Sequence, residues 1–359
     1  MRQYLNILQQ EIPKISEADL YVPIRNTHID SIDLVVIRVA LEKHFQIEIP
    51  DTLWFNYQTL IEALEYFHKN RKKVHEDFVY DKPEISISED TEVRMPQMIN
   101  SALSENWLLK FLGDTHWQLL SKGFDKKSSD FKDELGNRLY ATFIRIQYHT
   151  SPLNQFFENE FIKFISSIKS FGNNSFLSDI KGNSRHKSIR ATLLTTFSIK
   201  ENANNTKISK CEPKVKTNKI SQLHNTPMFL NEFRLLRKGL IDTVSTDFGA
   251  FHISDNILFS CKYEINPYSD INGVGLLYFA SYPIIADKCL LEYNYQTINY
   301  QTIHRDIFYF ANCNSSDTII FILNTIDEDE TLIKTLSSLS RVSDNQLLAR
   351  ILTVKQKTE

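Results

Sequence analysis

The spacing of apolar residues changes along this chain of 359 residues, from a helical period at the start to extended segments after about residue 97. Residues 31–45 carry apolar side chains on one helical face, at Ile32, Val35, Val36, Val39 and Phe45. Pro50 ends this segment, and residues 59–67 predict a second amphipathic helix. Since a domain averages about 150 residues, two or three folded units are expected, the first of them a helical domain over residues 1–70.

The overall composition narrows the class of protein. With 41 basic and 44 acidic side chains the net charge is −3, so the chain lacks the basic excess of a nucleic-acid-binding protein. No apolar run approaches the roughly 18 residues that span a bilayer, and the first residues form no secretory signal. The four cysteines are widely spaced, which argues against a disulfide framework or a zinc site. We therefore expect a soluble, cytoplasmic protein that binds no nucleic acid, no membrane and no metal.

Residues 71–96 are expected to form a flexible linker. They begin in a basic run and continue with acidic residues among alternating Ile and Ser, with no sustained apolar periodicity. A tether of this length would bring the helical domain to a neighbouring site at high effective concentration.

Residues 97–359 combine extended segments with two helices, predicted over residues 104–122 and 274–291. Pro283 lies inside the second of these helices and is expected to bend it. Strands are predicted at residues 138–148, 188–199, 256–266, 306–313, 318–324 and 347–354. A long helix among antiparallel strands, occurring twice, indicates an α+β body of two hot-dog folds in tandem, with halves over residues 97–210 and 211–359.

Ser31 stands at the start of the first predicted helix, where a short polar residue is most often a simple cap. The surrounding residues 28–35 (HIDSIDLV) and 41–51 (LEKHFQIEIPD) resemble the acyl carrier protein family, although His28 replaces its usual glycine. The resemblance implies an all-α four-helix carrier domain with 4′-phosphopantetheine attached covalently to Ser31. A helix N-terminus suits this attachment, because unpaired N–H groups and the positive end of the dipole stabilise a phosphodiester.

Four runs in the body resemble a second family: residues 103–110 (LSENWLLK), 113–117 (GDTHW), 136–141 (GNRLYA) and 270–280 (DINGVGLLYFA). They are similar to the double-hot-dog acyltransferase/decarboxylases of polyketide biosynthesis, of the leinamycin-biosynthesis type. The resemblance implies an enzyme that takes a malonyl or methylmalonyl group from CoA, holds it on a tyrosine, decarboxylates it and delivers acetyl or propionyl to a carrier protein. The acylated tyrosine corresponds to Tyr140, and Tyr148 is the reserve candidate.

The turn before the second helix supplies the remaining groups that this chemistry needs. In a hot-dog site the thioester carbonyl lies against a helix N-terminus, whose N–H groups stabilise an oxyanion and the enolate formed by decarboxylation. Gly273 and Gly275 would allow close approach of the backbone, or would only shape the turn. Asn272 would orient the thioester, or would likewise only make the turn.

Two further sets of residues are weaker candidates. His116 is either a catalytic residue or an ordinary hydrogen-bonded histidine of its helix. Arg185 and Arg190, beside His186 and Lys187, either bind the 3′-phosphate of CoA or belong to a solvated hairpin.

The leading hypothesis is an enzyme that loads its own fused carrier, from CoA through Tyr140 to Ser31. A double-hot-dog thioesterase, with Glu105 or Asp287 activating water, is one alternative. A dehydratase is another, although the chain lacks a His-x-x-x-Gly-x-x-x-x-Pro signature. A non-catalytic protein that docks a carrier to a synthase is the third. The expected partners are an acyl-CoA substrate, a phosphopantetheinyl transferase and a downstream polyketide synthase, and a homodimer is left open.

Overall fold

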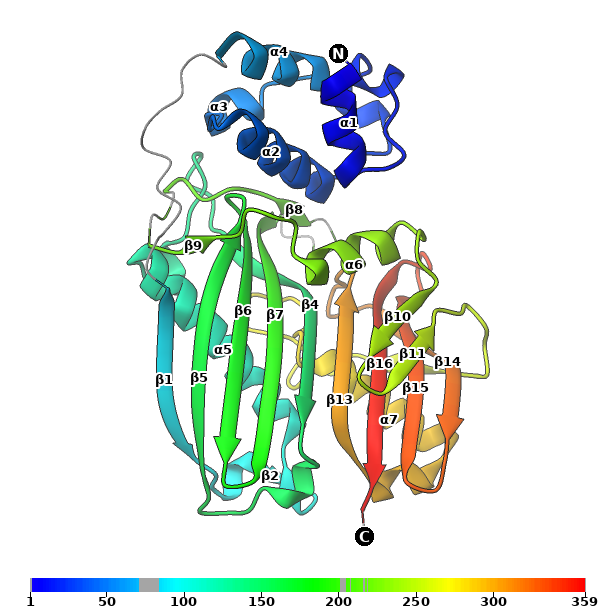
Figure 1. Cartoon of the computed structure of the whole chain (residues 1–359). Coiled ribbons are helices and arrows are strands. Elements are labelled where there is room, and N and C mark those ends of the chain that lie inside the picture. Colours follow the sequence, from blue (N-terminus) through cyan, green and yellow to red (C-terminus); the bar gives the residue numbers. More distant parts are fainter. Residues whose placement is uncertain are drawn as a thin grey trace.

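The computed structural model places a helical domain at one end of a long antiparallel sheet (Figure 1). It describes residues 2–70, 84–200, 205–206, 208–215, 217 and 219–358. The first described residue begins the helical domain, and the last, Thr358, directly follows the strand β16 (Leu347–Lys357).

The helical domain has its own apolar core, in which Leu8, Leu41 and Phe67 are fully buried. Its helices are α1 (Arg2–Glu11), α2 (Ser31–Phe45), α3 (Asp51–Trp54) and α4 (Leu60–Asn70), and the 3-10 turns η1 (Ala18–Leu20) and η2 (Ile24–Asn26) lie between α1 and α2. Asp30 caps α2, so Ser31 is the first residue of the helix rather than its cap. The helices predicted over residues 31–45 and 59–67 are therefore confirmed.

The body is built on one large sheet. Its strand order is β1-β5-β6-β7-β4-β13-β16-β15-β14-β12, with every neighbouring pair antiparallel. The strands are β1 (Ile85–Glu92), β4 (Tyr140–Thr150), β5 (Phe161–Phe171), β6 (Ser175–Ser184), β7 (Lys187–Lys200), β12 (Phe259–Glu264), β13 (Tyr300–Tyr309), β14 (Thr318–Glu328), β15 (Leu332–Arg341) and β16, and the short β8 (Ile208–Lys210) and β9 (Ser221–Gln222) pair with β7 and β5. Two separate ribbons pair β2 (Met98–Ile99) with β3 (Ala102–Leu103) and β10 (Thr243–Thr246) with β11 (Gly249–His252).

Two helices lie behind this sheet, one behind each half (Figure 1). They are α5 (Glu105–Phe124) and α7 (Ser281–Tyr293), and they share one apolar core with the inner strands. Strands β4 and β13 join the halves, with Ile146 opposite Ile307. A large antiparallel sheet around buried helices is consistent with the expected hot-dog fold. No helix within the described ranges is long and apolar enough to cross a membrane.

Part of the predicted linker is not a tether. Residues 71–83 lie outside the described residues, but the following residues form β1, which pairs with β5 along its whole length. Ile85 and Ile87 pack against the buried cluster that contains Phe176, which explains the alternation of Ile and Ser. The chain also stays with the first half beyond residue 210, because β9 pairs with β5.

The second long helix begins later than predicted. Helix α7 starts at Ser281, so Pro283 is its third residue and lies in the first turn, where its missing N–H leaves no hydrogen bond unmade. The expected bend at Pro283 is therefore wrong. Residues 270–278 form an irregular loop instead of a helical turn.

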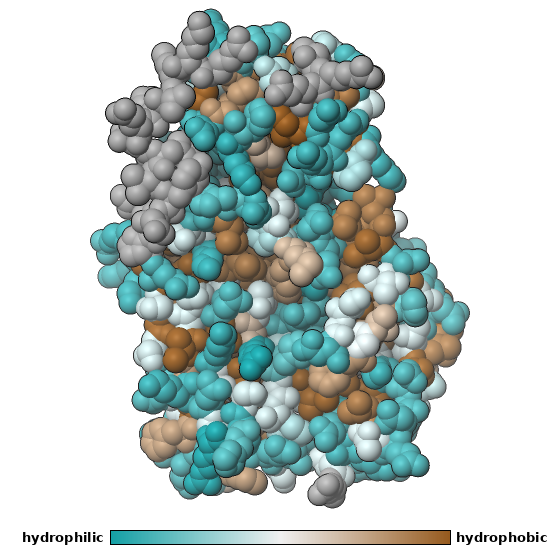
Figure 2. All heavy atoms as spheres, viewed as in Figure 1, coloured by the Kyte–Doolittle hydropathy of each residue, from teal (hydrophilic) through white to brown (hydrophobic). Residues whose placement is uncertain are grey.

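The helical domain is docked on the body through α2. Apolar residues of α2, Ile32, Val36 and Val39, belong to one buried cluster with Phe171 of β5 and with residues of α6 (Met228–Arg237). On the face shown in Figure 2 hydrophilic side chains predominate and the apolar ones gather in separate patches. The apolar residues of α2 that do not enter the core of the helical domain are thus covered by the body.

The polar part of this contact is Asp33, which is fully buried. Arg234 donates to its Oδ1 from Nη2 at 2.8 Å and from Nε at 3.1 Å, and Lys238 pairs with its Oδ2. Burial raises the pKa of Asp33, but the hydrogen bonds from Lys238, from the Asp30 N–H and from Arg234 outweigh it and hold that pKa below its usual value. The carboxylate therefore anchors α2 to α6.

Gly172 provides a test of this docking. It has φ +63°, and a Cβ built on it would lie 2.7 Å from Cγ1 of Val35. We expect Gly172→Ala to loosen the docked domain, measured as faster amide hydrogen exchange in α2. Gly136→Ala is the control, since Gly136 also has a positive φ and its Cβ would meet nothing within 4 Å. Equal exchange in both variants would contradict the docked arrangement.

Candidate active site

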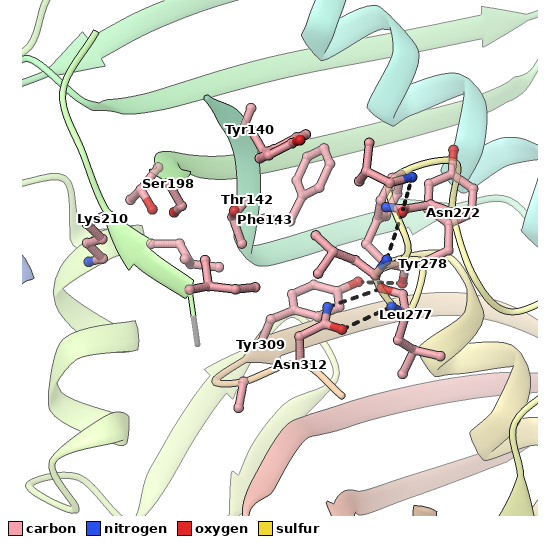
Figure 3. A pocket seen from close by; sticks show the side chains of 18 of the residues that line it. Tyr140, Thr142, Phe143, Ser198, Lys210, Asn272, Leu277, Tyr278, Tyr309 and Asn312 are labelled. Atoms are coloured by element: carbon pink, nitrogen blue, oxygen red, sulfur yellow. Dashed lines mark hydrogen bonds between the residues drawn. The ribbon is translucent and has the colours of Figure 1, made fainter. Parts of the chain in front are cut away.

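A cavity of about 810 Å³ lies where α2, β4, β8 and the loop of residues 270–278 meet. Figure 3 shows Lys210 at one end of it and Asn272 with Tyr278 at the other, with Tyr140 and Thr142 of β4 between them. Apolar side chains such as Phe143, Leu277 and Phe279 also line it.

Ser31 lines this cavity from the docked domain. Its side chain is exposed and makes no hydrogen bond to the residues that the structure describes. Asp30 Oδ1 accepts the N–H groups of Ile32 and Asp33, at 2.8 and 2.9 Å. The expected unpaired N–H groups at this helix N-terminus are therefore occupied by Asp30.

Tyr140 lies at the start of β4, half-buried in the cavity wall. In Figure 3 its ring extends from β4 toward the loop of Asn272. The guanidinium carbon of Arg138 lies 5.2 Å from the centre of the ring. Its hydroxyl has no hydrogen-bond partner in the described part of the chain.

The other tyrosines are less available. Tyr309 donates its hydroxyl to Phe279 O at 3.0 Å and Tyr282 donates to Ala311 O at 3.2 Å, and burial raises the pKa of both phenols. Tyr148, the reserve candidate, does not line the cavity; it is fully buried and donates to Glu105. Tyr278 alone resembles Tyr140, since its hydroxyl also has no partner among the described side chains.

The loop of residues 270–278 is organised by Asn272. Its Oδ1 accepts the N–H groups of Val274 and Leu276, at 3.1 and 3.0 Å, and its backbone O accepts that of Gly275 at 2.9 Å. Gly275 has φ +82°, and its N–H is already hydrogen-bonded to Asn272 O. It therefore shapes the turn and does not provide an oxyanion donor, contrary to expectation. Asn272 Nδ2 and the Gly273 N–H have no acceptor among the described residues, and both residues line the cavity.

His116 lies in the core and does not line the cavity. It is fully buried in α5, and its Nδ1 and Nε2 lie 2.7 Å from the hydroxyls of Ser178 and Thr195. Burial lowers the pKa of His116 to about 3. A histidine kept neutral by burial and hydrogen-bonded to two hydroxyls fits the structural interpretation, so His116 is not part of the candidate site.

This histidine predicts a pH dependence of stability. Its folded pKa lies below the ordinary value of 6.5, so its contribution is complete above pH 6.5 and is lost as the pH falls toward 3. Between pH 7 and 5.5 we expect wild type to lose about 1 kcal/mol more free energy of unfolding than His116→Gln. Urea unfolding at the two pH values measures this, and parallel losses would contradict it.

Glu105 and Asp287, the carboxylates considered for a thioesterase, lie in a buried ion network. Arg305 of β13 donates to Glu105 at 2.8 Å and to Asp287 at 2.6 Å, and Lys355 donates to Asp287 at 2.7 Å. Burial raises the pKa of Asp287, but Arg305 and Lys355 outweigh it and lower that pKa overall. Neither carboxylate lines the cavity, so neither can activate water there.

Arg185 and Arg190 are not brought to the cavity either. Arg185 forms the turn between β6 and β7 with φ 48°, and Arg190 lies near that end of β7, opposite His149. In Figure 1 this hairpin lies at the end of the sheet away from the helical domain. This placement favours the solvated hairpin over a site for the 3′-phosphate of a CoA bound in the cavity.

The structure adds residues that the sequence did not indicate. Lys210, Arg237 and Asp114 line the cavity, and Asp114 is the only carboxylate in its described lining, which contains no histidine. No group of three or more His, Cys, Asp or Glu side chains is placed to hold a metal ion in the described part of the chain. No local pattern marks Lys210 or Arg237, because β8 and α6 meet α5 only in the fold, whereas Asp114 stands in the run of residues 113–117.

Comparisons with known proteins agree with this division into two parts. Residues 6–67 match the family model described as "Phosphopantetheine attachment site". No curated protein matches the sequence. Among solved structures, one described as an oleoyl thioesterase from Lactobacillus plantarum has a TM-score of 0.56 at 10% identity, covering 76% of this chain and 97% of its own.

A 12:0-ACP thioesterase from Umbellularia californica has a TM-score of 0.52 at 11% identity, with 76% and 95% covered. An acyl-ACP thioesterase from Bacteroides thetaiotaomicron has a TM-score of 0.50 at 11% identity, with 75% and 97% covered. At such identities the likeness shows the fold alone. The chain thus joins an N-terminal phosphopantetheine-binding carrier domain to a body with the hot-dog fold of these thioesterases.

Proposed function

We propose that this chain is a double-hot-dog acyltransferase/decarboxylase that loads its own carrier domain in polyketide biosynthesis. It takes a malonyl or methylmalonyl group from CoA, holds it as an ester of Tyr140, decarboxylates it, and passes acetyl or propionyl to the thiol of a phosphopantetheine arm on Ser31. The observation that supports this is a shared cavity: Ser31 and Tyr140 line the same space of about 810 Å³. The arm supplies the accepting thiol.

The first step is acylation of Tyr140. Its hydroxyl oxygen attacks the thioester carbonyl, the C–S bond breaks, and the phenolic proton passes to the leaving CoA thiolate. An ordinary phenol, with a pKa of about 10, is a weak nucleophile at neutral pH and needs help. The Arg138 guanidinium beside the ring stabilises the developing phenolate. Asn272 Nδ2 and the Gly273 N–H are the donors for the oxyanion.

Decarboxylation follows on the tyrosine ester. The bond from the α-carbon to the carboxylate breaks, CO2 leaves, and the electron pair passes to the enolate oxygen, which the same two donors stabilise. A proton from solvent then adds to the α-carbon. The thiol of the arm attacks the ester carbonyl, the bond to the Tyr140 oxygen breaks, and the thiol proton passes to the leaving phenolate. The apolar side chains of Phe143 and Phe279 in the lining favour loss of a charged carboxylate.

A thioesterase is the second candidate, because the structural neighbours are named as acyl-ACP thioesterases. Glu105 and Asp287 are paired with Arg305 and lie outside the cavity. The general base of a thioesterase would therefore be Asp114, the one carboxylate among the described residues that line the cavity. Asp114 is exposed and accepts a hydrogen bond from Gln118 at 2.8 Å. A dehydratase has less support, since it needs a histidine and the described lining has none.

Intact-protein mass spectrometry of the phosphopantetheinylated chain tests the proposal. After incubation with malonyl-CoA or methylmalonyl-CoA we expect acetyl or propionyl on the arm, with release of CO2. Free acid in solution with an unacylated arm would instead support the thioesterase. No turnover of either CoA ester would support a non-catalytic docking protein.

A further inference from the structure

The amine of Lys210 is an unusual feature of the cavity. Lys210 ends β8, opposite Ser198 of β7, and its Nζ is buried without a hydrogen-bond partner among the described residues. It also forms no ion pair within the described ranges. Figure 3 shows its amine directed away from Tyr140. A buried ammonium without a partner is expensive to maintain and indicates a site for an anion.

The charged groups around this amine come from two elements. Asp30 caps α2 and Asp33 lies in its first turn, and Arg234 and Arg237 belong to α6. Burial lowers the pKa of Lys210 to about 7, the two carboxylates raise it, and the two guanidiniums lower it. Lys210 therefore lies within electrostatic range of the start of the docked α2, and it lines the same cavity as Ser31.

The two carboxylates are already matched by other cations. Asp33 is held by Arg234 and Lys238, and Asp30 lies 3.7 Å from Arg237. Lys210 is thus an additional positive group in this cluster. Arg237 also lines the cavity and is partly exposed. Besides Asp30, its guanidinium can therefore contact an anion in the cavity.

The helix N-terminus cannot bind an anion at Ser31 through its own N–H groups alone. Asp30 Oδ1 accepts the N–H groups of Ile32 and Asp33 and brings a negative charge close to the Ser31 hydroxyl. A phosphodiester on that hydroxyl therefore lies close to a carboxylate, and cations from outside the helix would stabilise it.

We propose that Lys210, together with Arg237, binds the phosphodiester that joins the arm to Ser31, and so directs the arm from the docked carrier into the cavity. The inference rests on the proposed attachment at Ser31. Lys210 is the binding residue from the body, and its buried Nζ offers a charge-assisted hydrogen bond that no described residue accepts. The free diphosphate of CoA has the same chemistry and must be distinguished from the attached arm.

The titration of Lys210 in the full chain provides the test. The chain is labelled with lysine carrying ¹³C at Cε, and the resonance that disappears in Lys210→Met is assigned to Lys210. We expect a midpoint near pH 7 before the arm is attached. With the arm attached, the midpoint should rise by about one pH unit or more, as for an opposite charge in contact.

The ³¹P resonance of the arm gives a second measurement. Its chemical shift should differ between the folded and the denatured wild-type chain. Most of that difference should disappear in Lys210→Met and remain in Lys210→Arg. The matched control is Lys262→Met, since Lys262 is an exposed lysine of β12 outside the cavity; it should resemble wild type.

Each outcome has a distinct meaning. An unchanged midpoint and ³¹P shift on a chain whose mass shows the arm on Ser31 would overturn the inference and leave the proposed function standing. A midpoint that moves when CoA is added to Ser31→Ala, but not when the arm is attached, would assign the site to free CoA and overturn it as well. A chain whose mass never increases with CoA and a phosphopantetheinyl transferase would overturn both proposals.

Discussion

Tyr140→Phe is expected to lower acyl loading of the arm on Ser31 by about a thousandfold or more, as removal of a nucleophile does. The variant keeps the ring that packs beside Arg138 and removes only a hydroxyl with no partner among the described residues. The fold should therefore persist, and the free energy of unfolding should change by less than about 0.5 kcal/mol. Intact-protein mass spectrometry after methylmalonyl-CoA addition measures the loading.

Two other tyrosines make this result specific. Tyr268→Phe removes a hydroxyl from a fully exposed side chain outside the cavity and should leave loading unchanged. Tyr278→Phe removes the other cavity hydroxyl that has no partner in the described structure. Full loading by Tyr140→Phe together with loss in Tyr278→Phe would assign the ester to Tyr278 and contradict the role of Tyr140.

The second large effect concerns the anchor of the docked domain. Removing one partner of a buried ion pair typically destabilises by about 3–5 kcal/mol, because a charge is left buried without compensation. Asp33 is fully buried, so we expect Asp33→Asn to release α2 from α6 and to expose the amides of residues 228–237 to hydrogen exchange. Acyl loading of the arm on Ser31 within the same chain should fall when α2 is released.

A double-mutant cycle separates the contact from the capping role of Asp33 in its own helix. Asp33→Asn, Lys238→Met and the double variant should show a coupling energy of about 1–3 kcal/mol in exchange protection. Glu65→Gln, an exposed acid of α4, is the matched control for loss of a negative charge and should leave exchange in α6 unchanged. Additive effects of the two substitutions would show that the ion pair does not hold the domains together.

Much of the fold could be predicted from local patterns. The helices of residues 31–45 and 104–122 have uninterrupted apolar faces, and the structure has α2 and α5 within two residues of them. The family model confirms the carrier domain. The second helix begins seven residues later than its apolar spacing predicts, because the loop before Ser281 is fixed by hydrogen bonds of Asn272 that apolar spacing does not indicate.

The error at residues 85–92 has a related cause. An edge strand with one apolar face shows only a weak alternation of apolar and polar residues. Here only Ile85 and Ile87 are apolar, and the polar residues around them are typical of a linker. Its pairing with β5 runs from Ile85 opposite Ile168 to Glu92 opposite Phe161, so it depends on residues far along the chain.

The candidate site was predictable where the chain carries a local motif and not elsewhere. Ser31, Tyr140, Asn272 and Gly273 stand in recognisable runs, and all four line the cavity. The anchor between Asp33 and Arg234 spans 201 positions, and Lys210 meets α2 only after docking. Such pairs are set by tertiary geometry, which no single segment encodes.

The central claim is that the body loads the carrier domain of its own chain. The most direct measurement uses two variants that have been treated with a phosphopantetheinyl transferase and CoA. Tyr140→Phe keeps Ser31, and Ser31→Ala keeps Tyr140. The two are mixed at low concentration. After addition of methylmalonyl-CoA, intact mass should show propionyl on the wild-type chain and none on Tyr140→Phe, alone or mixed. Loading of Tyr140→Phe in the mixture at the wild-type rate, or no loading of wild type, would contradict the account.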